Sequence, residues 1–406
     1  MDANSRFLVR SFRRYYRENR PLMPTRFGRR EFGFMFFDRH FVQRHMGFAR
    51  GEDLHRFLVS QVPAHCYYST AYYREPNAPT MDEKGWLGAD LIFDLDADQL
   101  PGADAMDYAE MLAKVKGEMI RLVDDFLLGD LGFEEEEILL VFSGGRGYHA
   151  HVRRDAVLAL GSPERREIVD YVTGNGLDMA WAFPRHSVPT YESPGGTWTR
   201  HSEDRLIPGE KDGGWKGRLR RGLEALLEDA GSLEMDAFRE RYPSTASFRK
   251  DRLQKLMGDL STAQRSILAT GTLAPLPSKR VQEAVVSIME TDVRPALSSR
   301  VDEPVTADIK RLIRLPGSIH GKTGLRVTPL SREQLEDFDP LLHAVPLEYG
   351  QESVKVSMRA DSELVFRGER LRLAGEEEVP ADLAVFLIGR RMAEIWRPGA
   401  EEGVKS

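Results

Sequence analysis

The chain has 406 residues, of which 41% are hydrophobic and 30% are charged, and its formal net charge is -7. This composition is typical of a globular protein of two or three domains and excludes collagen-like and wholly disordered chains. The longest apolar runs are far shorter than the about 18 residues that a membrane-spanning helix needs, and the arginine-rich N-terminus has no apolar signal-peptide core. We therefore expect a cytoplasmic protein with no membrane partner.

Basic residues are concentrated in two segments despite the net negative charge. Residues 1–30 hold nine arginines and two acids, a local charge of +7, and residues 310–326 hold five basic residues and no acid. The overall charge argues against a protein that coats nucleic acid indiscriminately, but both segments are suited to meet phosphates. The single cysteine, Cys66, excludes an internal disulfide and any zinc site built on two thiolates, and it fits a reducing compartment.

The first regular elements that the sequence predicts are a strand, a helix and a hairpin. Residues 89–96 alternate between apolar and acidic side chains, as a half-buried strand does. Apolar residues at three- and four-residue steps predict an amphipathic helix over residues 106–128. Two short runs, 138–142 and 148–153, flank a glycine-rich turn and predict the hairpin.

A helix and then an irregular stretch are expected in the middle of the chain. Ser162 can cap the helix, and Pro163 at its first position loses no hydrogen bond. Residues 182–217 hold four prolines and six glycines without sustained periodicity. This stretch therefore predicts a long irregular connection.

Helices are predicted again beyond this connection. They cover residues 219–228, 235–242, 248–260 and 279–289, with little of the alternation that strands show. A helix capped by Thr306 is expected to end at Pro316, and a final helix covers residues 381–396. The pattern thus indicates a mixed α/β core interrupted by a helical insertion.

Asp94 and Asp96 form the first candidate site. They lie two residues apart on the predicted strand, so their carboxylates project from one face with Cα atoms roughly 6.6 Å apart. Two carboxylates this close repel unless a cation neutralises them, and hard oxygen ligands suit Mg²⁺ or Mn²⁺. A third carboxylate would complete a two-metal site. An exposed acidic strand face is the alternative interpretation, and the pair alone does not decide between the two.

A glycine-rich turn, SGGRGYH at residues 143–149, forms the second candidate. Its glycines would expose backbone amides beside an arginine and a histidine, which suits a polyphosphate. The segment lacks the Gly-Lys-Ser/Thr ending of a P-loop, and a strand rather than a helix follows it. An ordinary hairpin turn is equally compatible with it. His151, two residues on, is interpreted as a hydrogen-bonded structural histidine.

Residues 302–324 form the third candidate, an acid followed by arginines and then by His320 and Lys322 in a loop. A solvated amphipathic helix would account for Lys310 and Arg311 but leaves His320 and Lys322 unexplained. Together the three segments supply carboxylates for metals and cations for phosphates. This combination is typical of phosphoryl or nucleotidyl transfer.

In this order the three segments resemble the catalytic small subunit of the archaeal and eukaryotic DNA primases. That family has a paired-aspartate strand, an SGxRGxH turn and a late segment like DxxVTxDxxRLIRxPxSxHGKTG, and the wording here suits the archaeal form. Residues 30–48 also resemble the family's N-terminal segment. The resemblance implies three catalytic and metal-binding residues, Asp94, Asp96 and Asp302. The nucleotide-binding residues that it implies are Arg44, Ser143, Arg146, His149, Arg314 and His320.

The resemblance also implies a fold and a domain plan. The family has an α+β fold in which a mixed sheet-and-helix catalytic domain carries an inserted helical subdomain. We expect the catalytic domain at residues 1–185 and 290–406 and the insertion at 186–289. Many relatives have a zinc knuckle where residues 100–106 have neither Cys nor His, so no zinc is predicted. Gly145 stands where some relatives have a second arginine.

The function implied is that of a DNA primase, a nucleotidyltransferase of the DNA-directed RNA polymerase type. It would join NTPs, with dNTPs as an open alternative, into short primers on a single-stranded DNA template with Mg²⁺ or Mn²⁺. The implied partner is a large subunit that carries an iron-sulfur cluster, which a chain with one cysteine cannot ligate itself. The alternatives are a stand-alone repair-type primase-polymerase and a non-catalytic nucleic-acid-binding module. Retention of the three aspartates argues against the second.

Overall fold

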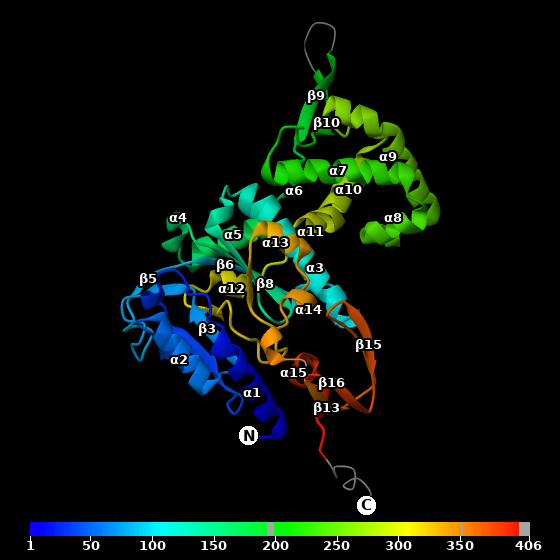
Figure 1. Cartoon of the computed structure of the whole chain (residues 1–406). Helices are drawn as coiled ribbons and strands as arrows, with labels where there is room; N and C mark the ends of the chain where they lie inside the picture. The colour runs from blue at the N-terminus through cyan, green and yellow to red at the C-terminus, as the bar shows by residue number, and fades with distance from the viewer. Residues whose placement is uncertain (193–198, 351, 398–406) are drawn as a thin grey trace, which may run out of the picture. The chain divides into compact units, whose positions relative to one another are not determined.

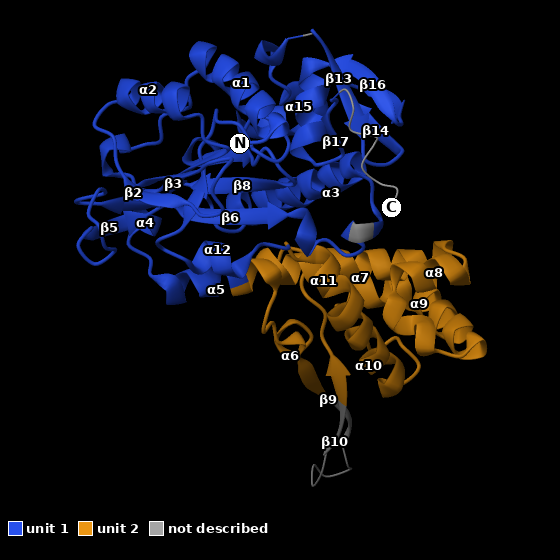
Figure 2. Ribbon diagram, turned by 90° about the horizontal axis from the view of Figure 1, so that it is seen from below, with its two compact units in different colours: residues 1–169, 300–406 blue, residues 170–299 orange. Residues whose placement is uncertain are grey.

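The computed structural model describes residues 1–192, 199–350 and 352–397 (Figure 1). The chain forms two compact units, one made of residues 1–169 and 300–406 and the other of residues 170–299 (Figure 2). The chain therefore leaves the first unit and returns to it. None of the helices in the described ranges is long and apolar enough to cross a membrane. The assignment of a catalytic domain and an insertion to residue ranges stays a prediction.

A four-stranded antiparallel sheet lies at the centre of the first unit, in the order β12-β7-β8-β6. Its strands are β6 (Leu91–Asp96), β7 (Ile138–Phe142), β8 (Gly147–Val152) and β12 (Thr328–Leu330). The predicted strand and hairpin are thereby confirmed. Asp94 on β6 pairs with His149 on β8, and Asp96 pairs with Gly147, so the paired aspartates lie beside the glycine-rich turn.

A second four-stranded antiparallel sheet has the order β11-β3-β1-β2. It contains β1 (Phe32–Met35), β2 (Gln43–Met46), β3 (His65–Ser69) and β11 (Leu312–Arg314). Strand β11 belongs to the late basic segment and pairs with β3 through Ile313 and Tyr68. This pairing attaches the late segment to the N-terminal third of the chain.

Helices, a three-stranded sheet (β16-β13-β17) and the strand pairs β4-β5 and β14-β15 complete the first unit. Apolar faces bury Phe12 and Tyr16 of the first helix and Val115 and Met119 of the third, which contacts β6 and β8. The helices are α1 (Ala3–Glu18), α2 (Gly51–Gln61), α3 (Tyr108–Arg121, followed by π-helical Leu122–Leu128), α4 (Asp155–Leu158), α5 (Ser162–Thr173), α12 (Glu303–Ala307), α13 (Arg332–Asp337), α14 (Pro340–His343) and α15 (Ala381–Gly389). The remaining strands are β4 (Ala71–Tyr73), β5 (Trp86–Ala89), β13 (Ser353–Met358), β14 (Ser362–Phe366), β15 (Glu369–Leu373), β16 (Glu376–Pro380) and β17 (Ala393–Ile395).

The second unit is mainly helical. Helices α7 and α9 pack against each other through buried leucines such as Leu223 and Leu260. The elements are α6 (Met179–Ala182), β9 (Arg185–Glu192), β10 (Thr199–Arg205), α7 (Gly214–Ser232), α8 (Met235–Arg241), α9 (Lys250–Thr270), α10 (Lys279–Ile288) and α11 (Arg294–Leu297). The four helices predicted in this region are confirmed, with longer bounds for two of them.

The irregular connection predicted at 182–217 is wrong over most of its described length. Strands β9 and β10 pair antiparallel, with Arg205 opposite Arg185. Their sequences, RHSVPTYE and TRHSEDR, have almost no apolar residues, so no hydrophobic alternation marks them. Backbone hydrogen bonds in a two-stranded ribbon need no such alternation. The prediction at residues 193–198 lies outside the described residues.

The helix predicted to start at Thr306 is also wrong. Asp302, not Thr306, caps the short helix α12, because its side chain accepts a hydrogen bond from the Val305 amide. The apolar residues Leu312 and Ile313 then belong to strand β11, since their backbone pairs with β3. Their spacing in the sequence is helical, but they form a strand because pairing with β3 outweighs a short local pattern.

The final helix is shorter than the predicted range 381–396. Helix α15 ends at Gly389, and strand β17 follows it and pairs with β13. Helix α15 is buried on all sides, so its sequence shows a continuous apolar run rather than a stripe whose end could be read.

Candidate functional site

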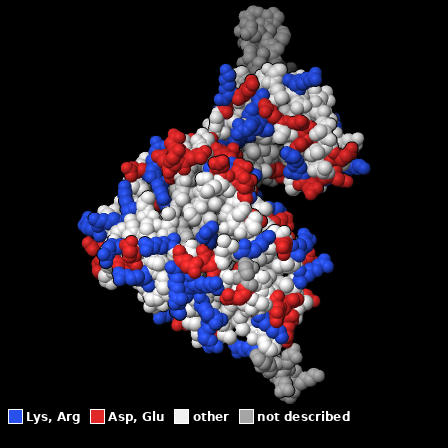
Figure 3. Space-filling view, viewed as in Figure 1, with Lys and Arg blue, Asp and Glu red and all other residues white. Residues whose placement is uncertain are grey.

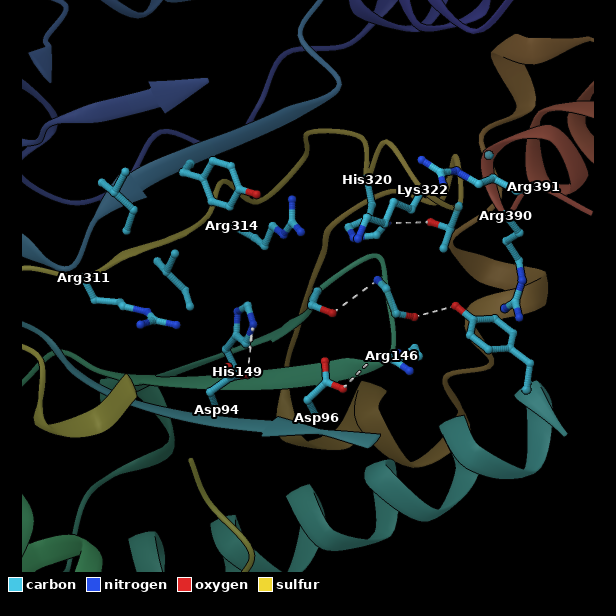
Figure 4. A pocket seen from close by; sticks show the side chains of 18 residues that line it. Asp94, Asp96, Arg146, His149, Arg311, Arg314, His320, Lys322, Arg390 and Arg391 are labelled. Carbon is cyan, nitrogen blue, oxygen red and sulfur yellow. Dashed lines mark hydrogen bonds and ion pairs between the residues drawn. The ribbon is translucent and has the colours of Figure 1, made fainter. Parts of the chain in front are cut away.

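A polar cavity of about 660 Å³ lies where the two four-stranded sheets of the first unit meet the end of α15 (Figure 4). Strands β6, β8 and β11 line it, together with the glycine-rich turn and the loop that follows β11. The lining residues are Tyr67, Asp94, Asp96, Tyr108, Ser143, Gly145, Arg146, His149, Arg311, Leu312, Ile313, Arg314, His320, Lys322, Thr323, Gly389, Arg390 and Arg391. The cavity thus collects acids and cations from segments far apart in the sequence.

Seven of the nine residues predicted for the site line this cavity. They are Asp94, Asp96, Ser143, Arg146, His149, Arg314 and His320. Asp302 does not line it but is adjacent, since its backbone amide donates to the Asp94 carbonyl at 2.9 Å. Arg44 does not line it either. The structure therefore gathers the three predicted segments and leaves Arg44 outside.

The carboxylates of Asp94, Asp96 and Asp302 act on one another. Burial, together with the charges of Asp96 and Asp302, raises the pKa of the Asp94 carboxyl to about 7. Both strand carboxylates keep contact with solvent, because the side chains of Asp94 and Asp96 are 20% and 39% exposed. Three carboxylates that repel one another beside a polar cavity are a donor set that fits a hard divalent cation. Within the described ranges, however, no group of three or more His, Cys, Asp or Glu is close enough to be recognised as a formed metal site.

The glycine-rich turn is held by its own serine. The Ser143 hydroxyl accepts hydrogen bonds from the amides of Gly145 and Gly147, each at 3.2 Å. These two amides are therefore bonded within the turn rather than exposed as the sequence suggested. Gly147 is required by close packing, because a Cβ there would lie 2.5 Å from the Leu95 carbonyl oxygen. Arg146 projects from the turn and pairs with Asp98 at 2.7 Å.

His149 is buried directly beside Asp94. Its Nε2 lies 3.2 Å from Asp94 Oδ1, and its Nδ1 has no hydrogen-bond partner among the described residues. Burial and the nearby Arg314 and Arg311 lower the pKa of the His149 imidazole to about 3, so the ring is neutral. By contrast, His151 is fully buried and bonded to the Tyr68 hydroxyl at 3.1 Å, which confirms its structural interpretation.

Arg314 is fixed by a histidine that sequence analysis did not select. Arg314 Nη1 donates to His65 Nδ1 at 2.6 Å, and its guanidinium lies 4.7 Å from the centre of the Tyr67 ring. The Gly321 amide also donates to His65 Nδ1, at 3.2 Å. Burial, Arg314 and Lys322 lower the pKa of His65 to about 2, so Nδ1 stays an acceptor.

A threonine of the same loop holds His320 in place. The Thr323 hydroxyl lies 3.1 Å from His320 Nδ1 and donates to the Gly144 carbonyl at 2.5 Å. Gly144 has a φ of +76°, and a Cβ there would lie 2.7 Å from the His320 Cβ. The glycine is thus needed for the turn and the His320 loop to meet.

Arg44 is held outside the cavity by a buried carboxylate. Its Nε and Nη2 donate to Glu31 at 3.0 and 3.1 Å, and the Glu31 side chain is fully buried. The guanidinium also lies 3.5 Å from the Lys310 carbonyl oxygen. Arg44 therefore contacts the segment just before Arg311 rather than the cavity itself.

Several lining residues were not predicted as site residues. Arg311 and Lys322 were noted within the third candidate segment, but no role was assigned to them. Tyr67, Tyr108, Arg390 and Arg391 belong to no motif, and only the fold brings them to the cavity. His65 precedes the first motif by about thirty residues and does not line the cavity, but the fold brings it to Arg314.

A cavity that sets carboxylates on a strand against a group of cations defines an enzyme that acts on phosphate compounds. Comparison with known proteins gives the family: the profile described as DNA primase small subunit matches residues 93–332. The protein named DNA primase small subunit PriS of Methanocella arvoryzae is 41% identical, over 97% of this chain and 99% of its own length. That of Methanococcoides burtonii is 40% identical over 97% of this chain and 99% of its own. The chain therefore belongs to the DNA primase small-subunit family.

This membership confirms the family and the primase function that the sequence predicts, and the mixed helices and strands of the structure confirm the α+β fold class. A third relative, the DNA primase small subunit PriS of Methanothrix thermoacetophila, is 40% identical over 96% of this chain and 98% of its own length. These relatives are archaeal, as the wording of the motifs indicates. The chain is thus a primer-synthesising, polymerase-type transferase.

Proposed function

We propose that the chain joins nucleotides on a single-stranded DNA template by nucleotidyl transfer in this cavity, as a DNA-directed enzyme of the 2.7.7 class. A 3′-hydroxyl oxygen attacks the α-phosphorus of the next nucleotide. One P–O bond forms, the bond to the β-phosphate oxygen breaks, pyrophosphate leaves, and the hydroxyl proton passes to solvent. The observation that supports this most is the placement of Asp94 and Asp96 opposite the cations of one cavity (Figure 4).

Asp94, Asp96 and Asp302 would hold Mg²⁺ or Mn²⁺. When bound, two such ions make the attacking hydroxyl more acidic and neutralise the charge that develops on the leaving group. Asp94 and Asp96 lie on one strand whose register is fixed by β8, so their spacing is set before any ion binds. Because the pKa of Asp94 is raised to about 7, a cation has to compete with a proton for this carboxylate.

The nucleotide-binding residues that we propose surround these carboxylates. Arg146 and Arg314 supply charge for the phosphates. Ser143 holds the turn, and His320 is held against the turn through Thr323, so both would lie beside the phosphates. His149 lines the cavity with its Nε2 3.2 Å from Asp94 Oδ1, where it would lie next to a bound nucleotide. Arg44 would act at the edge of the site, because Glu31 holds its guanidinium against the Lys310 carbonyl.

The partner that we propose is a large primase subunit with an iron-sulfur cluster, in a heterodimer. The relatives are named small subunits, which implies a larger one. Cys66 is the single cysteine and is buried, so this chain cannot supply the thiolates of such a cluster.

With this single cysteine we also expect no structural zinc. About one zinc per chain in chelator-washed protein would contradict this expectation.

The test is incorporation of labelled nucleotides on single-stranded template. The purified chain is incubated with NTPs or dNTPs and with Mg²⁺ or Mn²⁺, with and without a pre-annealed primer. We expect Asp96→Asn and Asp302→Asn each to abolish incorporation while template binding and melting temperature stay near those of the wild type. Incorporation at the wild-type rate by either variant would overturn the assignment, and template binding without incorporation by the wild type would indicate a binding module.

A further inference from the structure

Two arginines at the end of α15 line the cavity without any role in the proposed chemistry. Arg390 and Arg391 follow Gly389 directly, about sixty residues beyond the last position that the family profile matches. In Figure 4 they lie on the side of the cavity that also holds Arg146 and Lys322, across from Arg311 and Arg314. The C-terminal segment therefore completes one wall of the cavity.

This wall is anchored tightly to the rest of the site. A Cβ on Gly389 would lie 3.1 Å from the Lys322 carbonyl carbon, and one on Gly324 would lie 2.3 Å from Val385 Cγ1. Arg390 stacks on the Tyr108 ring at 3.8 Å, and the Tyr108 hydroxyl donates to the Gly145 carbonyl at 2.5 Å. The arginine is thus coupled through one tyrosine to the glycine-rich turn.

The cations of this wall lack acidic partners, apart from Arg146. In the part of the chain that the structure describes, no carboxylate lies within ion-pair distance of Lys322, Arg390 or Arg391. Burial lowers the pKa of the Arg390 guanidinium, and the like charge of Arg146 lowers it further. Unpaired cations held this close repel one another, so the wall is suited to a ligand with several negative charges.

The backbone of Arg391 gives an independent reason. Helix α15 ends in a Schellman motif, in which the Met392 amide donates to the Leu387 carbonyl at 2.9 Å and the Arg391 amide donates to the Ile388 carbonyl at 3.1 Å. Arg391 occupies the left-handed position of this motif, with a φ of +61°. Glycine is the favoured residue there, because a side chain is strained in this conformation. A role for its positive charge in binding an anion would explain why an exposed arginine stands where glycine is favoured.

We propose that Arg390 and Arg391 form a phosphate-binding wall for the polyphosphate tail of the incoming nucleotide, beyond the contact made by Arg146. This inference rests on the proposed function and adds a part of the chain that the three motifs do not include. A triphosphate concentrates several charges in one small group, whereas a nucleic-acid backbone spreads single charges along its length. Clustered, unpaired arginines beside the turn favour the nucleotide tail over the backbone of template or primer.

The test compares Arg391→Gly and Arg390→Gln with Arg372→Gln in the full-length chain. Arg372 is an exposed arginine on β15 that pairs with Glu363 and does not line the cavity, so it controls for loss of a positive charge. Inorganic tripolyphosphate serves as the probe, both as a competitor of NTP on a pre-annealed primer and in calorimetry. An unphosphorylated single-stranded oligonucleotide reports binding of the nucleic-acid backbone.

We expect Arg391→Gly and Arg390→Gln each to weaken tripolyphosphate binding and to raise the KM for NTP by roughly tenfold or more, as loss of a charged hydrogen bond does. Oligonucleotide affinity should change less than twofold, and Arg372→Gln should match the wild type. Arg391→Gly should keep or raise the melting temperature, because glycine relieves the strained backbone. Arg390→Lys, which keeps the charge, should restore part of the binding.

Unchanged tripolyphosphate binding in folded Arg391→Gly and Arg390→Gln would overturn the inference, as would a loss of oligonucleotide affinity instead. Arg146→Gln separates this failure from that of the proposed function. If Arg146→Gln weakens tripolyphosphate binding and the two α15 variants do not, only the phosphate wall is wrong. If the wild-type chain incorporates no nucleotide, the proposed function fails, while calorimetry still decides whether Arg390 and Arg391 bind polyphosphate.

Discussion

The Asp94 carboxyl shows how a single residue can record what its site is built to hold. Its pKa is raised to about 7 by burial and by Asp96 and Asp302, so without a cation the ionised form is disfavoured in the folded chain. The folded chain therefore binds a proton that the unfolded chain releases between the ordinary carboxyl pKa and about 7. The free energy of unfolding therefore falls as pH rises through that range, and the whole of this destabilisation is present above it.

The first prediction follows from this sign. In chelator, Asp94→Asn should raise the melting temperature more at pH 8 than at pH 5, because the amide removes a charge that only the higher pH imposes. Thermal melts of wild type and variant at both pH values measure the difference. Asp155→Asn, at an exposed carboxylate outside the cavity, is the matched control. An equal change at both pH values would show that repulsion among the carboxylates does not destabilise the chain.

His65 leads to the second prediction, since it orients Arg314 without reaching the substrate itself. His65→Phe should raise the KM for NTP by roughly tenfold, because Arg314 loses its acceptor and the cavity loses a fixed cation. His65→Asn should restore much of the affinity, since an amide oxygen can stand near the position of Nδ1. Steady-state kinetics on a pre-annealed primer and thermal melts measure both variants. A lower melting temperature with an unchanged KM in both would mean that His65 only packs.

Much of the site could be predicted because its chemistry is local in the sequence. Asp94 and Asp96 share a strand face, and the residues of SGGRGYH share one turn. Spacing in the sequence is therefore enough to place the members of each motif close together. His65, Tyr108 and Arg390 could not be found in this way, because their roles arise from a hydrogen bond or a stacking contact with residues far away in the chain. Asp302 needed a resemblance, since no local pattern distinguishes it from other helix-capping aspartates.

At the scale of elements, close backbone approach decides where the catalytic strand lies. Strands β6 and β8 are registered by Asp96 opposite Gly147, and the Leu95 carbonyl occupies the space that a side chain at residue 147 would need. The third prediction is that Gly147→Ala lowers the free energy of unfolding by about 1–3 kcal/mol, as overpacking does, and also reduces incorporation because β6 must shift. The midpoint of urea unfolding and the primer-extension rate measure the two effects.

A glycine in open space provides the control for that substitution. Nothing lies within 4 Å of a Cβ built on Gly117, in the middle of helix α3. Gly117→Ala should therefore stabilise the chain by up to about 1 kcal/mol, because alanine is the better helix former. If both alanine variants were neutral, the packing between β8 and β6 would be looser than the structure indicates.

Sequence patterns predicted the elements that carry a periodic or turn signal and failed where no such signal exists. The amphipathic helix over 106–128 buries one face, which its spacing records. The hairpin of β7 and β8 was found from its glycine-rich turn, although β8 is buried along its whole length. The ribbon of β9 and β10 has no apolar alternation, so its two strands could not be predicted. Helix α15 is buried on all sides, so the residue at which it ends could not be predicted. Leu312 and Ile313 were read as helical because three residues of strand are too few to show a period.

At the scale of the whole molecule, the number of charged residues overstates the charge at the surface, because some of these residues are buried in ion pairs. Lys and Arg gather on the face in Figure 3 over the part where α1 lies, which agrees with the arginine-rich N-terminus. One of the nine arginines in residues 1–30 is not available there, because Arg30 is fully buried. It pairs with the equally buried Asp90 at 2.6 Å and donates to the carbonyls of Ser69 and Thr70. The segment therefore presents fewer charges to a phosphate than its composition suggests.

The last prediction concerns this pair, which joins the N-terminal segment to the strands before the catalytic one. Asp90 also accepts a hydrogen bond from the Tyr72 hydroxyl, and its carbonyl accepts one from Arg165 of α5 at 2.8 Å. Arg30→Met and Asp90→Leu should each cost about 3–5 kcal/mol of unfolding free energy, because each leaves one charge buried without its partner. The double variant should cost clearly less than the sum, since it leaves neither charge. Urea unfolding of the four proteins gives this double-mutant cycle, and additive losses would mean that the two residues contribute through packing and not through their charges.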